Sequence, residues 1–250
     1  MIGSTLASGF LPSPNVELRR NGCKPDIIIL HYTGMDDVRV ACRWLCNPVS
    51  RVSCHYLIDE RGTIIQMVDE DLRAWHAGVS SWKGDEDINS RSIGIEIHNP
   101  GHAVGYPDFP EAQMLAVIAL CKDIIARYEI PASRVLGHSD IAPLRKIDPG
   151  EKFDWARLHT EGVGHWVRPE PMSGGSFLQL GDEGQTVEAL QSMLRLYGYA
   201  IEVSGKFDGL MQAIVRAFQR HFRPTRVDGI ADSSTVITLH RLLQALEGGC

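Results

Sequence analysis

The stretch Asp26-Ile27-Ile28-Ile29-Leu30-His31 follows Pro25 and decides how the first part of the chain folds. Its uninterrupted apolar run predicts a strand that is buried on both faces, which is typical of a sheet covered by helices on each side. Successive side chains of a strand point to opposite faces, so Ile27, Ile29 and His31 share one face. A histidine is therefore expected at the end of a buried strand.

Strand and helix patterns alternate along the rest of the first two thirds of the chain. Further strands are expected at His55–Asp59, Thr63–Val68, Ser92–His98 and Val135–Gly137, and helices at Val38–Leu45 and Glu111–Tyr128. This alternation predicts an α/β fold with a mixed central sheet flanked by helices.

The composition changes near residue 169, where prolines, glycines and serines gather in a pattern typical of a linker. The helical patterns that follow predict a small three-helix domain, with helices at Thr186–Tyr197, Leu210–Phe222 and Ser234–Leu246. The chain is therefore expected to comprise a first domain at residues 1–168, a linker at 169–181 and a second domain at 182–250.

The overall composition excludes several classes of protein. The 250 residues are 44% hydrophobic and 22% charged, which is ordinary for a globular protein. The net charge of −6 argues against a nucleic-acid or anionic-membrane partner, since both need a basic face. No apolar run approaches the roughly 20 residues that a membrane span needs.

Two histidines and one carboxylate form the first candidate site. His138 directly follows the short strand Val135–Gly137, as His31 ends its own strand, and Asp148 stands ten residues further on. Two histidines and a carboxylate on strand-end loops are the ligand set of an open catalytic zinc site, with water in the fourth position. The alternative for His31 is a buried histidine whose ring is satisfied structurally.

Glu96 and Lys146 are candidate catalytic groups beside such a site. Glu96 lies within the expected strand Ser92–His98, where a carboxylate is costly unless it is paired or reactive. It is either half of a buried ion pair or a general base beside a metal-activated water. Lys146 precedes Asp148 by two residues, so in an extended segment it would face the same side and reach a developing oxyanion. The alternative for Lys146 is a surface lysine.

Six ordered blocks of sequence resemble one enzyme family. They are Ile29–Thr33, Val52–Ile58, Trp75–Gly78, Ile93–Ile97, Gly137–Pro143 and Lys146–Gly150. They resemble the zinc N-acetylmuramoyl-L-alanine amidases related to peptidoglycan recognition proteins and to bacterial anhydromuropeptide-recycling amidases. The resemblance covers roughly residues 15–160 and implies a peptidoglycan-recognition-protein-like amidase fold.

The resemblance also implies roles for individual residues. It places the zinc ligands on His31, His138 and Asp148, and the catalytic glutamate and lysine on Glu96 and Lys146. The residues expected to contact substrate are Tyr32, His55, Trp75, His76 and Asn99, and a purely structural role is the alternative for these.

The implied activity is hydrolysis, with one Zn²⁺ per chain, of the amide bond between N-acetylmuramic acid, or its 1,6-anhydro form, and L-alanine of the stem peptide. The expected partners are peptidoglycan or anhydromuropeptides, and no protein partner is implied. A peptidoglycan recognition module without catalysis and a zinc endopeptidase acting within the stem peptide are the alternatives.

The C-terminal segments Ala213–Gln219 and Val227–Gly229 resemble a small peptidoglycan-binding domain. The N-terminus lacks a basic and apolar secretory signal, and Cys42 and Cys121 fall on apolar helix stripes, where reduced core thiols are expected. These features favour the cytoplasm, whereas a wall-binding domain favours the periplasm or cell envelope.

Overall fold

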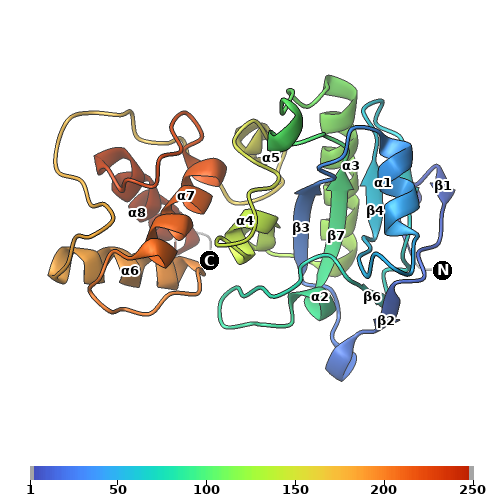
Figure 1. The fold of residues 1–250 in the computed structure, drawn as a ribbon, viewed down its shortest axis with the longest axis horizontal. Coiled ribbons are helices and arrows are strands. Elements are labelled where there is room, and N and C mark those ends of the chain that lie inside the picture. Colours follow the sequence, from blue (N-terminus) through green and yellow to red (C-terminus); the bar gives the residue numbers. More distant parts are fainter. Residues whose placement is uncertain (1–2, 248–250) are drawn as a thin grey trace.

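The computed structural model describes residues 3–247, in which a mixed six-stranded sheet carries helices on both faces (Figure 1). The strand order is β1-β5-β4-β7-β3-β8, and a separate antiparallel pair joins β2 and β6. The strands are β1 (Gly9–Phe10), β2 (Val16–Leu18), β3 (Ile27–Tyr32), β4 (Tyr56–Ile58), β5 (Ile64–Gln66), β6 (Leu72–Ala74), β7 (Ser92–Ile97) and β8 (Val135–Gly137). The predicted fold class is confirmed.

Five helices accompany the sheet in the described part of the first domain, and three form the C-terminal domain. They are α1 (Val38–Leu45), α2 (Ile88–Arg91), α3 (Glu111–Tyr128), α4 (His138–Ile141), α5 (Trp155–Thr160), α6 (Gln185–Tyr197), α7 (Gly209–Phe222) and α8 (Ser233–Glu247). The predicted ranges of α1 and α3 agree with the structure, and those of the three C-terminal helices differ by one residue at individual ends. The short helix α4 was expected to be a polar loop.

The two faces of the sheet are covered by different elements. Ile28 and Leu30 of β3 belong to the same buried cluster as the apolar face of α3. On the other face, Leu57 of β4 packs with Ala41 and Leu45 of α1. The carboxyl ends of β3 and β7 lie between α1 and the elements around α4, as Figure 1 shows.

The C-terminal helices pack against the first domain and share its core. Ile27 and Ile29 of β3 lie in one buried cluster with Val187 of α6 and Phe218 of α7. Figure 1 shows α7 beside α4, on the side of the sheet domain that is remote from β1. The two predicted domains are thus docked on each other through apolar side chains.

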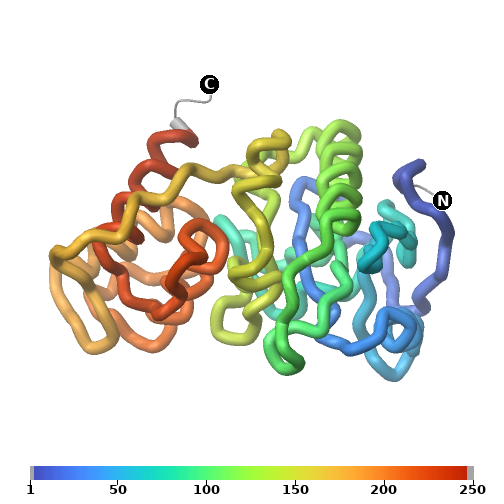
Figure 2. Tube along the Cα trace, turned by 90° about the horizontal axis from the view of Figure 1, so that it is seen from above, coloured from blue at the N-terminus to red at the C-terminus, as the bar shows by residue number. Residues whose placement is uncertain are grey.

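The segment predicted to be a linker, residues 169–181, is held along the C-terminal helices. Glu170 N donates to Thr238 Oγ1 at 3.0 Å, and Leu178 forms a β-bridge with Ala231. Figure 2 shows this segment following the outside of the helical domain. It connects the two domains, but it is bound to the C-terminal helices and does not extend freely between the domains. Within the described residues, no helix combines the length and apolar character that crossing a bilayer requires.

Candidate active site

The sheet register brings the two histidines together. Leu30 on β3 and Gly137 on β8 are partners in a parallel ladder, so the residues that follow them, His31 and His138, emerge side by side. His138 begins α4, and the loop after that helix returns Asp148 to the same place. All three side chains are buried, and each offers one potential ligand atom.

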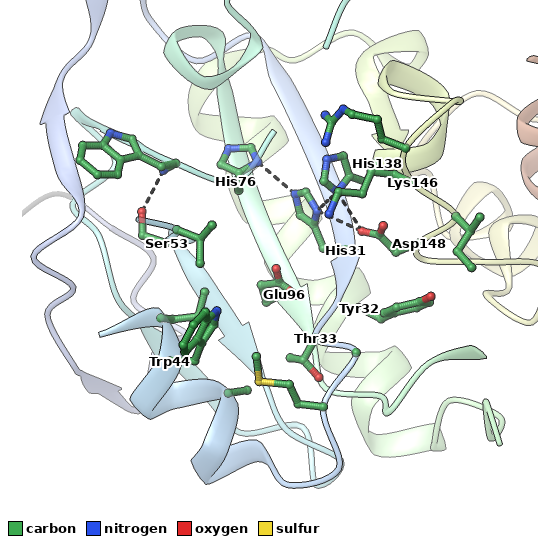
Figure 3. Close-up of a pocket in the computed structure, with 18 residues that line it drawn as sticks. His31, Tyr32, Thr33, Trp44, Ser53, His76, Glu96, His138, Lys146 and Asp148 are labelled. Atoms are coloured by element: carbon green, nitrogen blue, oxygen red, sulfur yellow. Dashed lines mark hydrogen bonds and ion pairs between the residues drawn. The ribbon is translucent and has the colours of Figure 1, made fainter. Parts of the chain in front are cut away.

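The three potential ligand atoms form a compact triangle (Figure 3). His31 Nδ1 lies 2.9 Å from His138 Nδ1 and 3.2 Å from Asp148 Oδ2, and His138 Nδ1 lies 3.0 Å from the same oxygen. Ligand atoms about 2.0–2.1 Å from a tetrahedral zinc ion lie about 3.3 Å apart, so the triangle is close to the size that zinc requires. These residues therefore fit a metal ion.

A chain of hydrogen bonds fixes the tautomer of His31. The Ser92 hydroxyl donates to the Ile88 carbonyl at 2.7 Å, so its oxygen accepts from His76 Nε2 at 3.1 Å. His76 Nδ1 is then free to accept from His31 Nε2, 3.0 Å away. This arrangement leaves the lone pair of the neutral His31 ring on Nδ1, where a metal ligand needs it.

His138 is oriented in a similar way. Its Nε2 lies 3.1 Å from the carbonyl oxygen of Ala77, which can only accept, so Nε2 carries the hydrogen. In the neutral ring, Nδ1 therefore presents its lone pair to the centre of the triangle. Arg145 Nη2 donates to the same carbonyl at 3.0 Å, which holds the Ala77 peptide in place.

The charges of the triangle suit metal binding. Burial and the neighbouring His138 lower the pKa of His31 to about 4, which favours the neutral ring. Burial alone would raise the pKa of Asp148, but His138 and His31 outweigh it and hold that pKa well below its usual range. An ionised carboxylate and a neutral imidazole are the protonation states that bind zinc.

Glu96 lies beside the triangle without a stabilising partner. It lines the same cleft as His31 and Asp148, and its Oε2 is buried with no hydrogen-bond partner within residues 3–247. Burial and the negative charge of Asp148 raise the pKa of Glu96 well above its usual value, whereas Lys146 opposes that shift. The alternative of a buried ion pair thus has no direct contact to support it.

Lys146 and Asp148 both line this cleft, which has a volume of about 390 Å³. The backbone between them belongs to no strand, yet the two side chains face the same space, as expected for the lysine. Within the described residues, no carboxylate forms an ion pair with the Lys146 ammonium. Figure 3 shows it close to the three ligands.

The residues expected to contact substrate fall into two groups. Tyr32 and Trp75 line the cleft, and the Trp75 indole nitrogen is buried without a partner among the described residues. His76 also borders the cleft, but its two ring nitrogens are used to orient His31.

His55 and Asn99 are not among the residues that line the cleft, and both make contacts within the protein. The buried His55 ring accepts from Gly94 N at 3.0 Å and lies 3.1 Å from Leu72 O. Asn99 Nδ2 donates to Pro107 O at 3.0 Å and so braces the loop that follows β7.

Trp44 is a cleft residue that the sequence analysis missed. It is 45% exposed on α1 and faces Tyr32 across the site in Figure 3. A signal was available, because Trp44 lies off the apolar stripe of its helix that packs on the sheet. Large aromatic side chains outside a buried stripe are candidates for ligand contact.

The fold and site together define a class of protein: a hydrolase with a group of residues that could hold a metal ion at the carboxyl ends of its central strands. Comparison with family models agrees, because a model of N-acetylmuramoyl-L-alanine amidases matches residues 21–151 and a model of a peptidoglycan-binding domain matches residues 183–239.

Individual relatives extend this agreement over both domains. The chain is 37% identical over 233 residues to N-acetylmuramoyl-L-alanine amidase AmiD of Escherichia coli, a match that covers 87% of this chain and 82% of AmiD. It is 37% identical over 165 residues to 1,6-anhydro-N-acetylmuramyl-L-alanine amidase AmpD of Citrobacter freundii, covering 59% of this chain and 86% of AmpD.

Solved structures show the same architecture. AmiD from E. coli, in complex with its substrate anhydro-N-acetylmuramic acid-L-Ala-D-gamma-Glu-L-Lys, superposes with a TM-score of 0.77 at 34% identity and 92% coverage of both chains. AMPDH3 from Pseudomonas aeruginosa, in complex with anhydromuramic pentapeptide, gives a TM-score of 0.74 at 30% identity, covering 92% of this chain and 95% of AMPDH3. The chain belongs to the N-acetylmuramoyl-L-alanine amidase family, and the resemblance noted in the sequence is confirmed.

Proposed function

We propose that this protein is a zinc-dependent amidase that cuts the bond between the lactyl group of N-acetylmuramic acid and L-alanine of the stem peptide. The observation that carries the proposal is the convergence of three buried ligand atoms beside the unpartnered oxygen of Glu96 in an open cleft. Three protein ligands leave one coordination position for reactants, whereas a structural zinc site is closed by a fourth.

One zinc ion per chain is expected, held by His31, His138 and Asp148. When bound there, zinc supplies Lewis-acid polarisation of the scissile carbonyl and favours ionisation of the attacking water. The hydrogen bonds from His31 to His76 and from His138 to Ala77 keep both ligand rings oriented towards the same point.

Glu96 is the proposed proton carrier. It accepts a proton from the attacking water as the water oxygen bonds to the lactyl carbonyl carbon. It then gives that proton to the nitrogen of L-alanine as the carbon–nitrogen bond breaks. Burial raises the pKa of Glu96 above its usual value, which makes its carboxylate a stronger base for the first of these two steps.

Lys146 is proposed to stabilise the negative charge that develops on the carbonyl oxygen. Its ammonium borders the cleft and is close enough to influence the pKa of both His31 and Glu96. A fixed positive charge in a partly buried site acts on a developing oxyanion without further reorganisation.

The walls of the cleft suit a sugar carrying a short peptide. Trp44 and Trp75 line the cleft and supply apolar surface to it. The relatives support the 1,6-anhydro form as one substrate, because AmiD and AMPDH3 were solved with anhydromuropeptides bound.

The test is mass spectrometry of the products formed from soluble anhydromuropeptides and from intact sacculi, with Glu96→Gln as the inactive control. The expected products are stem peptides with a free L-alanine amino group and sugars with a free lactyl carboxylate. Peptide fragments still attached to sugar would instead show an endopeptidase. Binding without any product would show a recognition module.

The C-terminal domain is proposed to bind polymeric peptidoglycan, on the strength of its match to a peptidoglycan-binding domain. A second binding module would raise the effective concentration of the enzyme at the wall. The inactive Glu96→Gln chain should therefore sediment with sacculi even when excess soluble anhydromuropeptide fills the cleft. Complete displacement by the soluble compound would contradict a separate wall site.

A further inference from the structure

The carboxylate of Asp140 connects the C-terminal domain to the helix that carries His138. Asp140 lies two residues after His138 in α4, and its side chain is fully buried. Tyr199 donates its hydroxyl hydrogen to Asp140 Oδ1 at 2.9 Å, and His221 Nδ1 lies 2.7 Å from Oδ2. Both of these partners belong to the C-terminal domain.

The direction of these bonds follows from the groups involved. An ionised carboxylate can only accept, so the hydrogen of the short His221 contact resides on Nδ1. Burial beside the charge of Asp140 raises the pKa of Tyr199 well above its ordinary value, so the phenol keeps its hydrogen. Asp140 Oδ2 also accepts from Gly137 N at 2.8 Å, which ties the residue before His138 to the same carboxylate.

The two donors are themselves held rigidly. The His221 ring stacks on Trp155 at 3.7 Å and on Phe222 at 3.8 Å between ring centroids. Tyr199 packs edge-on against the fully buried Trp82, with ring centroids 5.0 Å apart. Hydrogen bonds from such fixed donors determine where the carboxylate lies.

Helix α4 cannot supply this rigidity alone. It has four residues, and one turn of helix is not stable without tertiary contacts. Its first residue, His138, must nevertheless keep Nδ1 directed at His31 and Asp148.

We infer that Tyr199 and His221 are positioning residues for the metal site, because they fix Asp140 and thereby orient His138. This inference rests on the proposed function, since the ligand role of His138 is part of it. The C-terminal domain then has two tasks: it presents a peptidoglycan-binding surface, and it completes the support of the catalytic centre.

The experiment compares full-length Tyr199→Phe, His221→Gln and the double variant with the wild type. Tyr197→Phe is the matched control, because Tyr197 is equally buried in the same domain but its hydroxyl contacts His165 instead of α4. The readouts are the zinc dissociation constant from chelator competition, the visible absorption spectrum of the cobalt-substituted protein and the Tm of the metal-free protein.

The double variant is expected to bind zinc about 10–100-fold more weakly, the usual effect of losing an outer-shell partner. Its cobalt spectrum should also change, which a merely structural role would not require. Tyr199→Phe, which removes a single oxygen atom, should weaken zinc binding less than the double variant does, and it provides the test if the double variant does not fold. Tyr197→Phe should retain the wild-type zinc affinity and cobalt spectrum.

Unchanged zinc affinity and cobalt spectrum in the Tyr199 and His221 variants would overturn the inference. An equal loss in Tyr197→Phe would overturn it too, because general destabilisation would then explain the effect. The His31→Ala variant tests the proposed ligand set separately from the positioning role of Tyr199 and His221. If it keeps full zinc affinity, the proposed ligand set is wrong. If it loses zinc while the double variant does not, only the positioning role is wrong.

Discussion

His31 and Glu96 lie directly opposite each other in the parallel ladder between β3 and β7. Paired residues of neighbouring strands point their side chains to the same face of a sheet, at a strand separation of about 4.8 Å. The backbone therefore places a candidate metal ligand and an unpartnered carboxylate in one cleft, independently of any loop.

The first prediction follows from this pairing and concerns Glu96→Gln. The variant should retain its zinc and melt close to the wild-type temperature, because Glu96 Oε2 has no partner in the described structure to lose. Its kcat should fall by about 10²–10⁴-fold, the usual contribution of a positioned general base. Zinc content, Tm and kcat measured on one preparation test all three expectations.

Glu70 provides the matched control for that experiment. It is another buried glutamate, but it is bound by Arg127 and by the hydroxyls of Tyr56 and Tyr128. Glu70→Gln should lower the free energy of unfolding by about 1–3 kcal/mol and leave kcat per folded molecule unchanged. If Glu96→Gln behaved like Glu70→Gln, the general base would have to be sought elsewhere.

The second prediction concerns the metal. Chelation should abolish activity, and added zinc should restore it. Asp148→Ala should lose both zinc and activity, because two histidines alone bind the ion weakly. Metal analysis by atomic absorption, alongside turnover, provides the measurement. Full turnover by a rigorously metal-free sample would exclude the proposed mechanism.

The third prediction is a loss of stability of the metal-free protein in acid. Burial, and then the charge of Arg19, lower the pKa of His55 to about 3. Since the unfolded chain holds its proton more tightly, stability is full above the unfolded value of about 6.5 and falls as the pH drops towards 3. Urea unfolding between pH 7 and pH 4 measures this slope, which should be smaller in His55→Gln. An unchanged slope would show that other groups control it.

The fourth prediction concerns a chain ending at residue 168. Ile27, Ile29 and Leu136 share a core cluster with the C-terminal helices, and burial of such a side chain contributes about 1.5–3 kcal/mol. The shortened chain should therefore melt at a lower temperature and bind a hydrophobic dye. Equal Tm values for the two chains would indicate that the first domain is independently stable.

Much of the site could be predicted because its signals are local. A histidine at the end of an apolar strand and a carboxylate within another are both visible from alternation alone, as His31 and Glu96 show. The hydrogen bonds that orient the ligands could not be predicted, because the bonded residues are distant in sequence. His76 and His31 are 45 residues apart, and His221 and Asp140 are 81 residues apart.

The segment predicted to be a linker, residues 169–181, shows a second limit of prediction from sequence. Prolines and glycines near residue 170 indicate irregular backbone correctly, but they do not reveal whether that backbone is docked. That outcome depends on side chains such as Thr238, nearly seventy residues away, which accepts a hydrogen bond from Glu170 N. The packing of α7 on α4 is likewise a property of two surfaces, and neither surface has a local sequence signature.

The pairing of Leu30 with Gly137 has a consequence for the order of events during folding. The two histidines that follow these residues are 107 positions apart, and they become neighbours only when β8 joins β3. Contacts between such distant parts of a chain form slowly, because a long loop must close first. A nascent or partly folded chain therefore lacks the complete group of His31, His138 and Asp148, and the proposed metal site exists only after β8 has joined β3.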